Sequence, residues 1–305
     1  MISTDRFGRF IMDKTTYDQK TVLRYILWAF IPAYIIQFIA AAVVYRVGLA
    51  QGRLVIARMM FVPALAVILS GRGLSGLGWK PGIRKNILNI LAAWFLPVIL
   101  TALGAGLYFL LFPSHLDASN TAFMASLGPQ VMEQLAAQGL TPQTYTLISV
   151  ISSVTYAPLL NMFLALGEEI GWRGFLYPRL KERFGYRKGV IFGGFIWAVW
   201  HWPLIRLIGY EYGTGYIGFP ISGMLIFCIF TIAGGLLHDW LYEKSGTIWV
   251  PSLFHGSINA ARTLPQVFCI TGTGSAILLG PAPNGLIAVI PTAVLALIIM
   301  MRRKA

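Results

Sequence analysis

The segment "LISVISSVTYAPLLNMFLALGEEIGWRGF", residues 147–175, places two adjacent glutamates and an arginine at the end of a long apolar run. A run of this length is sufficient for a helix that crosses the hydrocarbon core of a bilayer, which takes about 20 residues. Ionisable side chains are costly inside such a helix, and they are kept where they face a protein interior or a wet cavity. The segment therefore predicts a membrane-spanning helix that carries part of a functional site.

The composition of the whole chain agrees with this prediction. Of its 305 residues, 57% are hydrophobic and only 11% are charged, whereas a soluble domain contains about 25% charged residues. The sequence has no internal repeat and no low-complexity segment. We therefore expect a single integral-membrane domain over residues 1–305, of the all-α polytopic class, embedded in a lipid bilayer.

About eight apolar segments are candidates for membrane spans, because each provides most of the ~20 residues that a span needs. They cover approximately residues 23–45, 54–71, 87–112, 146–173, 189–206, 217–240, 246–264 and 281–301. The first 20 residues are polar and mixed in charge, so we expect no cleavable signal peptide. Residues 175–185, "FLYPRLKERFG", mix apolar and basic side chains. We interpret them as a short interfacial helix on the cytosolic surface, with an ordinary basic loop as the alternative.

The distribution of basic residues predicts the orientation. The net charge is +13, but the lysines and arginines cluster in short loops and tails, so we expect no nucleic-acid partner. If the amino terminus is cytosolic and each span crosses once, most basic residues lie on the cytosolic side. The other side then holds Arg46, Arg53, Arg206 and Arg262, and the loop 113–145 has neither lysine nor arginine. This asymmetry predicts that both termini are cytosolic.

Few strongly polar side chains lie within the predicted spans. They are Glu168, Glu169, Arg173, His201, His238, Asp239, His255 and Asn259. Glu169 and Arg173 are four positions apart, on one helix face and in the order that favours an ion pair. Such a pair often has a structural role only. Glu168 lies about 100° around the helix and is left for chemistry. We interpret His238 and Asp239, near the cytosolic end of their span, as interfacial.

The remaining polar residues are predicted to lie at one level. His255 and Asn259 project from one face of their span. Counted from the predicted cytosolic helix ends, Glu168, His201 and His255 differ in depth by only ~6 Å. Three helices would then present a carboxylate, two imidazoles and an amide below the cytosolic surface, which are suitable groups for hydrolysis. Taken singly, His201 can equally be an interhelical contact, and an asparagine such as Asn259 most often is one.

Metal binding is the alternative use of these side chains. Two histidines and a glutamate form a hydrolytic zinc ligand set, and His201 and His255 are the candidate ligands. The helical signature H-E-x-x-H is absent from the sequence. Cys228 and Cys269 lack the paired spacing of a disulfide framework or a metal cluster. We therefore expect no cofactor, with zinc left open.

Three short motifs occur in order on the predicted spans. "EEIGWR" (168–173) matches E-E-x-x-x-R, "WAVWH" (197–201) sits where F-x-x-x-H is found, and "HGSIN" (255–259) matches H-x-x-x-N. With the predicted topology, they make the chain resemble the CPBP intramembrane proteases. This family includes CAAX prenyl endopeptidases and bacteriocin-processing and immunity proteins. The motif-bearing core covers residues 145–265, and "GLGWKPGIRKN" (76–86) is similar to a cytosolic patch of bacterial members.

The resemblance implies a CAAX-protease-like hydrolase, a glutamate-dependent endopeptidase with a cytosol-facing cavity. Its substrate would be a peptide or the end of a membrane protein, cut near the cytosolic membrane face. Glu168 would be the general base that activates water, assisted by His201. His255 and Asn259 would stabilise the oxyanion. Trp197 stands where the family usually has phenylalanine, and we expect packing there to be preserved.

The same resemblance implies that Glu169 and Arg173 hold the site together, and that the chain lies in the inner or plasma membrane of a bacterial cell. A non-proteolytic immunity or scaffold protein that binds a partner is an alternative, and a zinc-dependent intramembrane protease is another. A transporter would also keep buried Glu and His residues. Transporters often consist of duplicated halves, and the sequence shows no such duplication.

Overall fold

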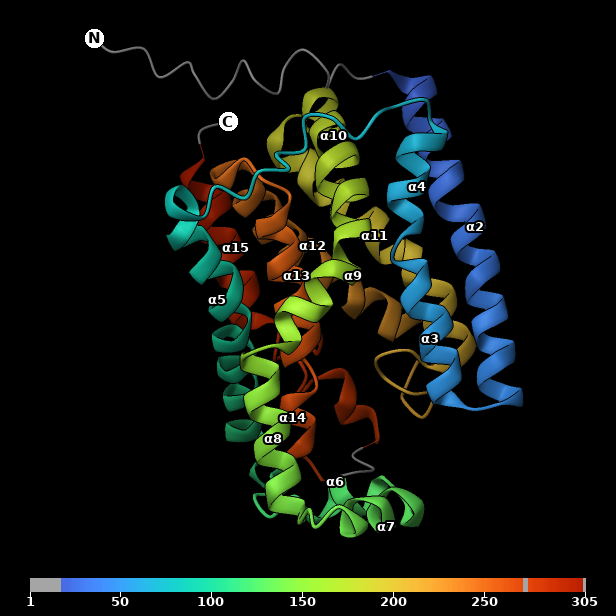
Figure 1. The fold of residues 1–305 in the computed structure, drawn as a ribbon, viewed down its shortest axis with the longest axis vertical. Helices are drawn as coiled ribbons and strands as arrows, with labels where there is room; N and C mark the ends of the chain where they lie inside the picture. The colour runs from blue at the N-terminus through green and yellow to red at the C-terminus, as the bar shows by residue number, and fades with distance from the viewer. Residues whose placement is uncertain (1–17, 271–273, 304–305) are drawn as a thin grey trace.

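The computed structural model describes residues 18–270 and 274–303, and Figure 1 shows their arrangement. We expected no cleavable signal peptide in the first 20 residues. Most of that segment, residues 1–17, lies outside the described residues. Helices and turns form the described part of the chain, in which the β structure is an isolated bridge between Leu116 and Cys269. The predicted all-α class is confirmed.

The longer helices form a bundle, and shorter ones lie in the loops. The bundle consists of α2 (Gln19–Arg46), α3 (Leu49–Met59), α4 (Val62–Leu69), α5 (Ile83–Leu111), α8 (Pro142–Val154), α9 (Ala157–Gly171), α10 (Tyr177–Phe184), α11 (Tyr186–Ile208), α12 (Ile221–Ser245), α13 (Trp249–Ala261) and α15 (Ile290–Arg302). The loops contain η1 (Pro113–His115), α6 (Thr121–Ser126), α7 (Pro129–Ala137), α14 (Leu264–Val267) and η3 (Gly274–Leu278). A π-helical turn, η2 (Trp172–Leu176), joins α9 to α10.

The bundle has two distinct ends. In Figure 1, α2 begins and α15 ends at the top, while α6 and α7 lie at the bottom. We call these the upper end and the lower end. Consecutive long helices run in opposite directions between them, so that α9 and α10 climb to the upper end and α11 descends. The first and last described helices therefore reach the same end, as expected for two termini on one side of a membrane.

Within residues 18–270 and 274–303, five helices are long and apolar enough to cross a membrane. They are α2, the continuous pair Leu49–Leu69, α5, α11 and α12. The bent pair Gln143–Val154 and Ala157–Phe184 makes a sixth if it is one span. The last two predicted spans correspond to α13 and α15, which have 13 residues each. The polytopic prediction is confirmed, and the number of eight spans stays a prediction.

The fourth predicted span, residues 146–173, is bent and longer than expected. α8 and α9 meet at an angle of 52°. Pro158, in the first turn of α9, explains the break, because proline lacks an N–H group and disfavours helical geometry in the residue before it. At its other end α9 continues through η2 into α10.

The predicted helix within residues 175–185 is present as α10, and the alternative of a basic loop is wrong. α10 is not a separate surface helix, however, because it extends α9 along the bundle. Tyr177 and Leu180 are buried. Lys181 Nζ donates to both carboxylate oxygens of Asp239, at 2.7 and 2.8 Å, and to Glu243 at 2.6 Å. The basic segment is thus bound to α12 by ion pairs.

The close packing of α9 against α13 positions the polar residues. A Cβ atom on Gly256 would lie 2.5 Å from the backbone oxygen of Pro158 and from the backbone nitrogen of Met162. Only a residue without a side chain allows the two backbones to approach so closely. The preceding residue, His255, is thereby brought against the carboxylates of α9.

We expect Gly256→Ala to lower the free energy of unfolding by about 1–3 kcal/mol, because the added methyl group forces α13 away from α9. Thermal or denaturant unfolding of the purified chain in detergent measures this change.

Gly106→Ala is the matched control. Gly106 is exposed on α5, and no atom lies within 4 Å of the position that its Cβ would take. Alanine there should raise the free energy of unfolding by about 0.5–1 kcal/mol, since glycine is the poorer helix former. Equal losses in the two variants would contradict the close packing.

Candidate active site

A cavity of about 70 Å³ lies in the bundle between α3, α9, α11, α12 and α13. A water molecule needs only about 10–15 Å³ of such space, so the cavity has room for several. Its wall includes all of the residues that the sequence singled out for chemistry, namely Glu168, His201, His255 and Asn259. The structure thus brings together at one cavity the side chains from the three helices that were predicted to share a level.

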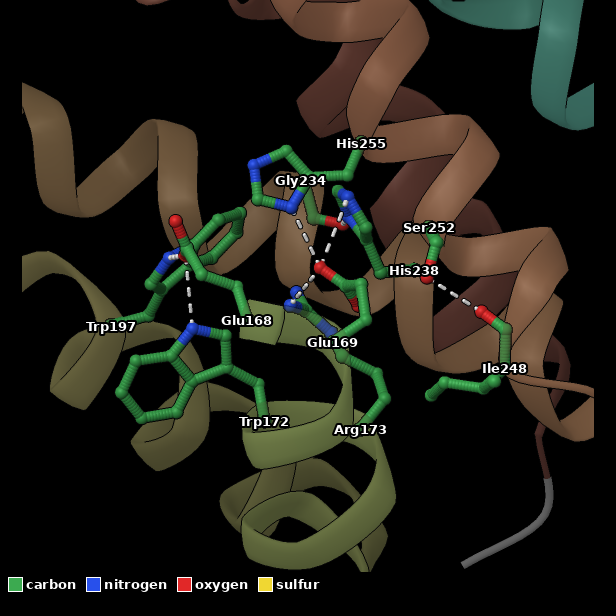
Figure 2. A network of polar contacts seen from close by, with 10 residues as sticks. All are labelled: Glu168, Glu169, Trp172, Arg173, Trp197, Gly234, His238, Ile248, Ser252 and His255. Carbon is green, nitrogen blue, oxygen red and sulfur yellow. Dashed lines mark hydrogen bonds and ion pairs between the residues drawn. The ribbon is translucent and has the colours of Figure 1, made fainter. Parts of the chain in front are cut away.

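Glu169 forms the predicted ion pair with Arg173. Arg173 donates to Glu169 Oε1 at 2.9 Å, and neither side chain is exposed. His255 Nδ1 lies 2.8 Å from the same oxygen (Figure 2). Because a carboxylate has no proton to give, His255 Nδ1 is the donor, and its Nε2 is left for the cavity. Glu169 therefore orients His255 as well as neutralising Arg173.

Glu168 is held by two indole rings. Its Oε2 accepts hydrogen bonds from Trp172 Nε1 at 3.1 Å and from Trp197 Nε1 at 2.7 Å (Figure 2). The other oxygen, Oε1, has no hydrogen-bond partner among the residues that the structure describes. The sequence suggested only packing for Trp197, but its N–H group makes a contact that phenylalanine lacks. An indole N–H group can donate a hydrogen bond, and this property could have predicted the contact between Trp197 and a nearby carboxylate from the sequence.

His201 presents a lone pair to the cavity. Its Nδ1 lies 3.0 Å from the carbonyl oxygen of Trp197, four residues earlier in α11. A carbonyl only accepts, so Nδ1 carries the proton and Nε2 is an unprotonated acceptor in the neutral ring. The rings of Trp200 and Tyr210 lie 4.9 and 6.0 Å away by their centroids and fix the imidazole plane.

His238 belongs to the site, and its interpretation as an interfacial residue is wrong. The side chain is completely buried and lines the cavity. Its Nδ1 donates to the carbonyl oxygen of Gly234 at 2.7 Å, and Nε2 lies 3.9 Å from Glu169 Oε1. The neighbouring Asp239 is buried too, as the partner of Lys181. The rule that ionisable residues within a span face the protein interior would have located both.

A metal ion has a different candidate ligand set from the one expected. Glu169, His238 and His255 offer ligand atoms that all lie within 4.8 Å of one another, and all three residues are buried. Two histidines and a carboxylate are a ligand set of hydrolytic zinc. His201 is not part of this group. Arg173 opposes a cation here, because its guanidinium lies 2.9 Å from Oε1 of the same Glu169 carboxylate.

The comparisons with known proteins concern the segment that contains these residues. Residues 149–261 match the family described as type II CAAX prenyl endopeptidase Rce1-like. The resemblance to the CPBP proteases is confirmed for this region. The matched region runs from α8 through α13 and includes all three motifs of the family.

A relative supports the same assignment. CAAX prenyl protease 2 of Methanococcus maripaludis is 30% identical over 115 residues, which are 37% of this chain and 42% of the relative. The chain therefore matches less than half of the relative's length. The CPBP resemblance rests on the region that forms most of the cavity wall.

We expect Glu169→Gln to lower the free energy of unfolding by about 3–5 kcal/mol, because Arg173 would remain charged and fully buried without a counter-charge. Denaturant unfolding in detergent, with helix content as the signal, measures the loss.

The matched comparison is Glu168→Gln, the same substitution at the adjacent position. Its amide oxygen still accepts hydrogen bonds from the two indoles, so the loss should be only about 1 kcal/mol. A larger effect at position 168 than at position 169 would contradict the division of roles between the two glutamates.

Proposed function

We propose that this chain is an intramembrane endopeptidase, in which Glu168 and His201 activate water for attack on a peptide bond. The observation that carries the proposal is the pair of acceptors on one cavity, Glu168 Oε1 and His201 Nε2. Both side chains are held by hydrogen bonds through their other polar atoms. The match to the Rce1-like family over residues 149–261 supports the same activity.

Water activation requires a base within hydrogen-bond reach of the water. A water between Glu168 and His201 would give a proton to one of them as its oxygen attacks the carbonyl carbon of the peptide. The neutral indole donors of Trp172 and Trp197 keep Glu168 in place without cancelling its charge. Expulsion of the amine then breaks the C–N bond. The proton taken from water passes to the leaving nitrogen, so that one water is consumed and a carboxylic acid and an amine are formed.

The oxyanion of the intermediate needs donors that are already in position. The amide N–H of Asn259 and the Nε2–H of His255 would supply them from one face of α13. Nδ1 of His255 already donates to Glu169, so donation from Nε2 requires the imidazolium form. Glu169 and Arg173 are thus positioning residues in this mechanism.

The proposed substrate is a peptide or a segment of a membrane protein, reached within the bilayer. The name of the relative indicates a prenylated CAAX end, and such peptides belong among the first substrates to test. We place the chain in the inner or plasma membrane of a bacterial cell, with both termini cytosolic.

A zinc-dependent protease is the second candidate, and the cluster of Glu169, His238 and His255 favours it. These three side chains would hold the ion, and the ion would supply an acidic bound water. Glu168 would then act as the base beside it. The two mechanisms differ in their need for metal and in the role of His238.

We expect Glu168→Gln to reduce peptide cleavage by about 10²- to 10⁴-fold while the chain stays folded, because the general base is lost. The assay uses the purified chain in detergent or liposomes with a quenched peptide library that includes prenylated CAAX peptides. Glu182→Gln, on the exposed side of α10, is the matched control and should leave cleavage unchanged.

The same assay with a strong chelator separates the mechanisms. Cleavage that survives the chelator supports the glutamate mechanism. If the chelator abolishes cleavage and zinc restores it, the zinc mechanism replaces it, and His238→Gln should then lose the bound zinc. If the wild type cleaves nothing while Glu168→Gln keeps the cellular phenotype, a partner-binding immunity or scaffold role replaces the protease.

A further inference from the structure

The cavity is closed toward the upper end of the bundle. Above Glu168 on the same continuous helix, Trp172, Phe175 and Tyr177 are at most 1% exposed, as is Tyr25 of α2. The rings of Tyr25 and Phe175 stack with their centroids 4.5 Å apart. We call these four residues the upper seal. Since α9, η2 and α10 form one helix, the seal separates the carboxylates from the basic upper end.

The cavity extends instead toward the lower end. Its half-buried wall residues include Met60, Tyr210, Glu211, Ile258 and Arg262. Glu211 follows the end of α11 at Ile208, and Arg262 follows the end of α13 at Ala261. Both of these helices descend from the upper end in Figure 1. These wall residues form a mouth that extends from Met60, packed beside Gly167, down to Glu211 and Arg262 near the lower helix ends.

An ion pair lies across this mouth. Arg262 donates to Glu211 Oε1 in a short contact, and Asn284 donates to Glu211 Oε2 at 3.4 Å. Glu211 has a φ of 72°, a left-handed conformation that is rare for a residue with a side chain. Backbone strain of this kind persists where the surroundings impose it, often at functional sites. The Arg262 side chain is 30% exposed, so solvent can take the place of its partner.

The basic residues indicate which side of the membrane the mouth faces. Lys181, Lys188 and Lys244 lie on helix ends at the upper end, which the positive-inside rule places in the cytosol. The mouth then faces the non-cytosolic half of the membrane. This differs from the cytosol-facing cavity that the sequence and the family resemblance suggested.

We propose that the peptide reaches the site from the non-cytosolic half of the membrane, through the mouth. The Glu211–Arg262 ion pair blocks this mouth until the substrate displaces the ion pair. This inference rests on the proposed function for the identity of the ligand. The direction of access rests on the upper seal and on the mouth residues, so it can be tested without any measurement of cleavage.

The first test measures thiol accessibility in the full-length chain with Cys228→Ala and Cys269→Ala. Ile258→Cys reports on the mouth, and Lys188→Cys reports on the upper end. Each is treated with a membrane-impermeant maleimide in right-side-out and in inverted vesicles. We expect the two positions to be labelled from opposite sides. Met60→Cys, directly after α3, repeats the measurement in case Ile258→Cys does not fold.

Two outcomes of the labelling overturn the proposal. Labelling of Ile258→Cys and Met60→Cys from the side that labels Lys188→Cys places the opening at the upper end. Failure to label the folded mouth variants from either side shows that no aqueous path reaches the cavity there. Neither outcome depends on protease activity, so a failure of the proposed function remains distinguishable.

A second test closes the mouth covalently. Glu211→Cys and Arg262→Cys are joined by a short bis-methanethiosulfonate reagent, which forms a disulfide with each thiol. The joined pair should lose cleavage at least about tenfold, as expected when access is gated, and a reductant that cleaves the disulfides should restore it. The matched control joins Arg303→Cys and Glu243→Cys, which replace a partly exposed ion pair at the upper end, and should keep cleavage. Loss of cleavage in the control pair alone would overturn the proposal.

Discussion

The buried ion pair between Glu169 and Arg173 is the constraint on which the site depends. Neither side chain is exposed, and each would be prohibitively costly to bury without the other. The pair also fixes its neighbours. His255 of α13 donates to Glu169, and the Arg173 guanidinium lies 4.6 Å from the ring centre of Trp197 in α11 and 4.8 Å from that of Tyr177. One pair within a single helix thus links it to two others around the cavity.

The two adjacent glutamates differ because the helix turns them toward different donors. Glu169 meets a guanidinium and an imidazole, which neutralise it and make it part of the framework. Glu168 meets two neutral indoles, which hold it but leave its charge in place. Trp197 connects the two environments, since its N–H group bonds to Glu168 while its ring faces Arg173. Two identical side chains one residue apart therefore have different surroundings, an ion-paired one at Glu169 and an indole-lined one at Glu168.

The residues of the cavity wall come from two parts of the sequence. The carboxylates and imidazoles come from residues 149–261, where the family match lies. Part of the mouth comes from elsewhere, with Met60 preceding the matched region and Arg262 and Asn284 following it. The match to the CPBP proteases therefore covers the carboxylates and imidazoles completely and the mouth only in part.

The sequence by itself determined the all-α membrane class, the Glu169–Arg173 pair and the meeting of Glu168, His201, His255 and Asn259. These depend on hydropathy and helical spacing, which are local properties. Only the tertiary structure decided that α10 continues α9, that His238 joins the site, that Trp197 binds Glu168 and that the cavity reaches the lower end. Each of these depends on which helices touch and on where glycines let them approach, as at Gly256. Spacing along one chain carries no information about such contacts, because they join residues that are far apart in the sequence.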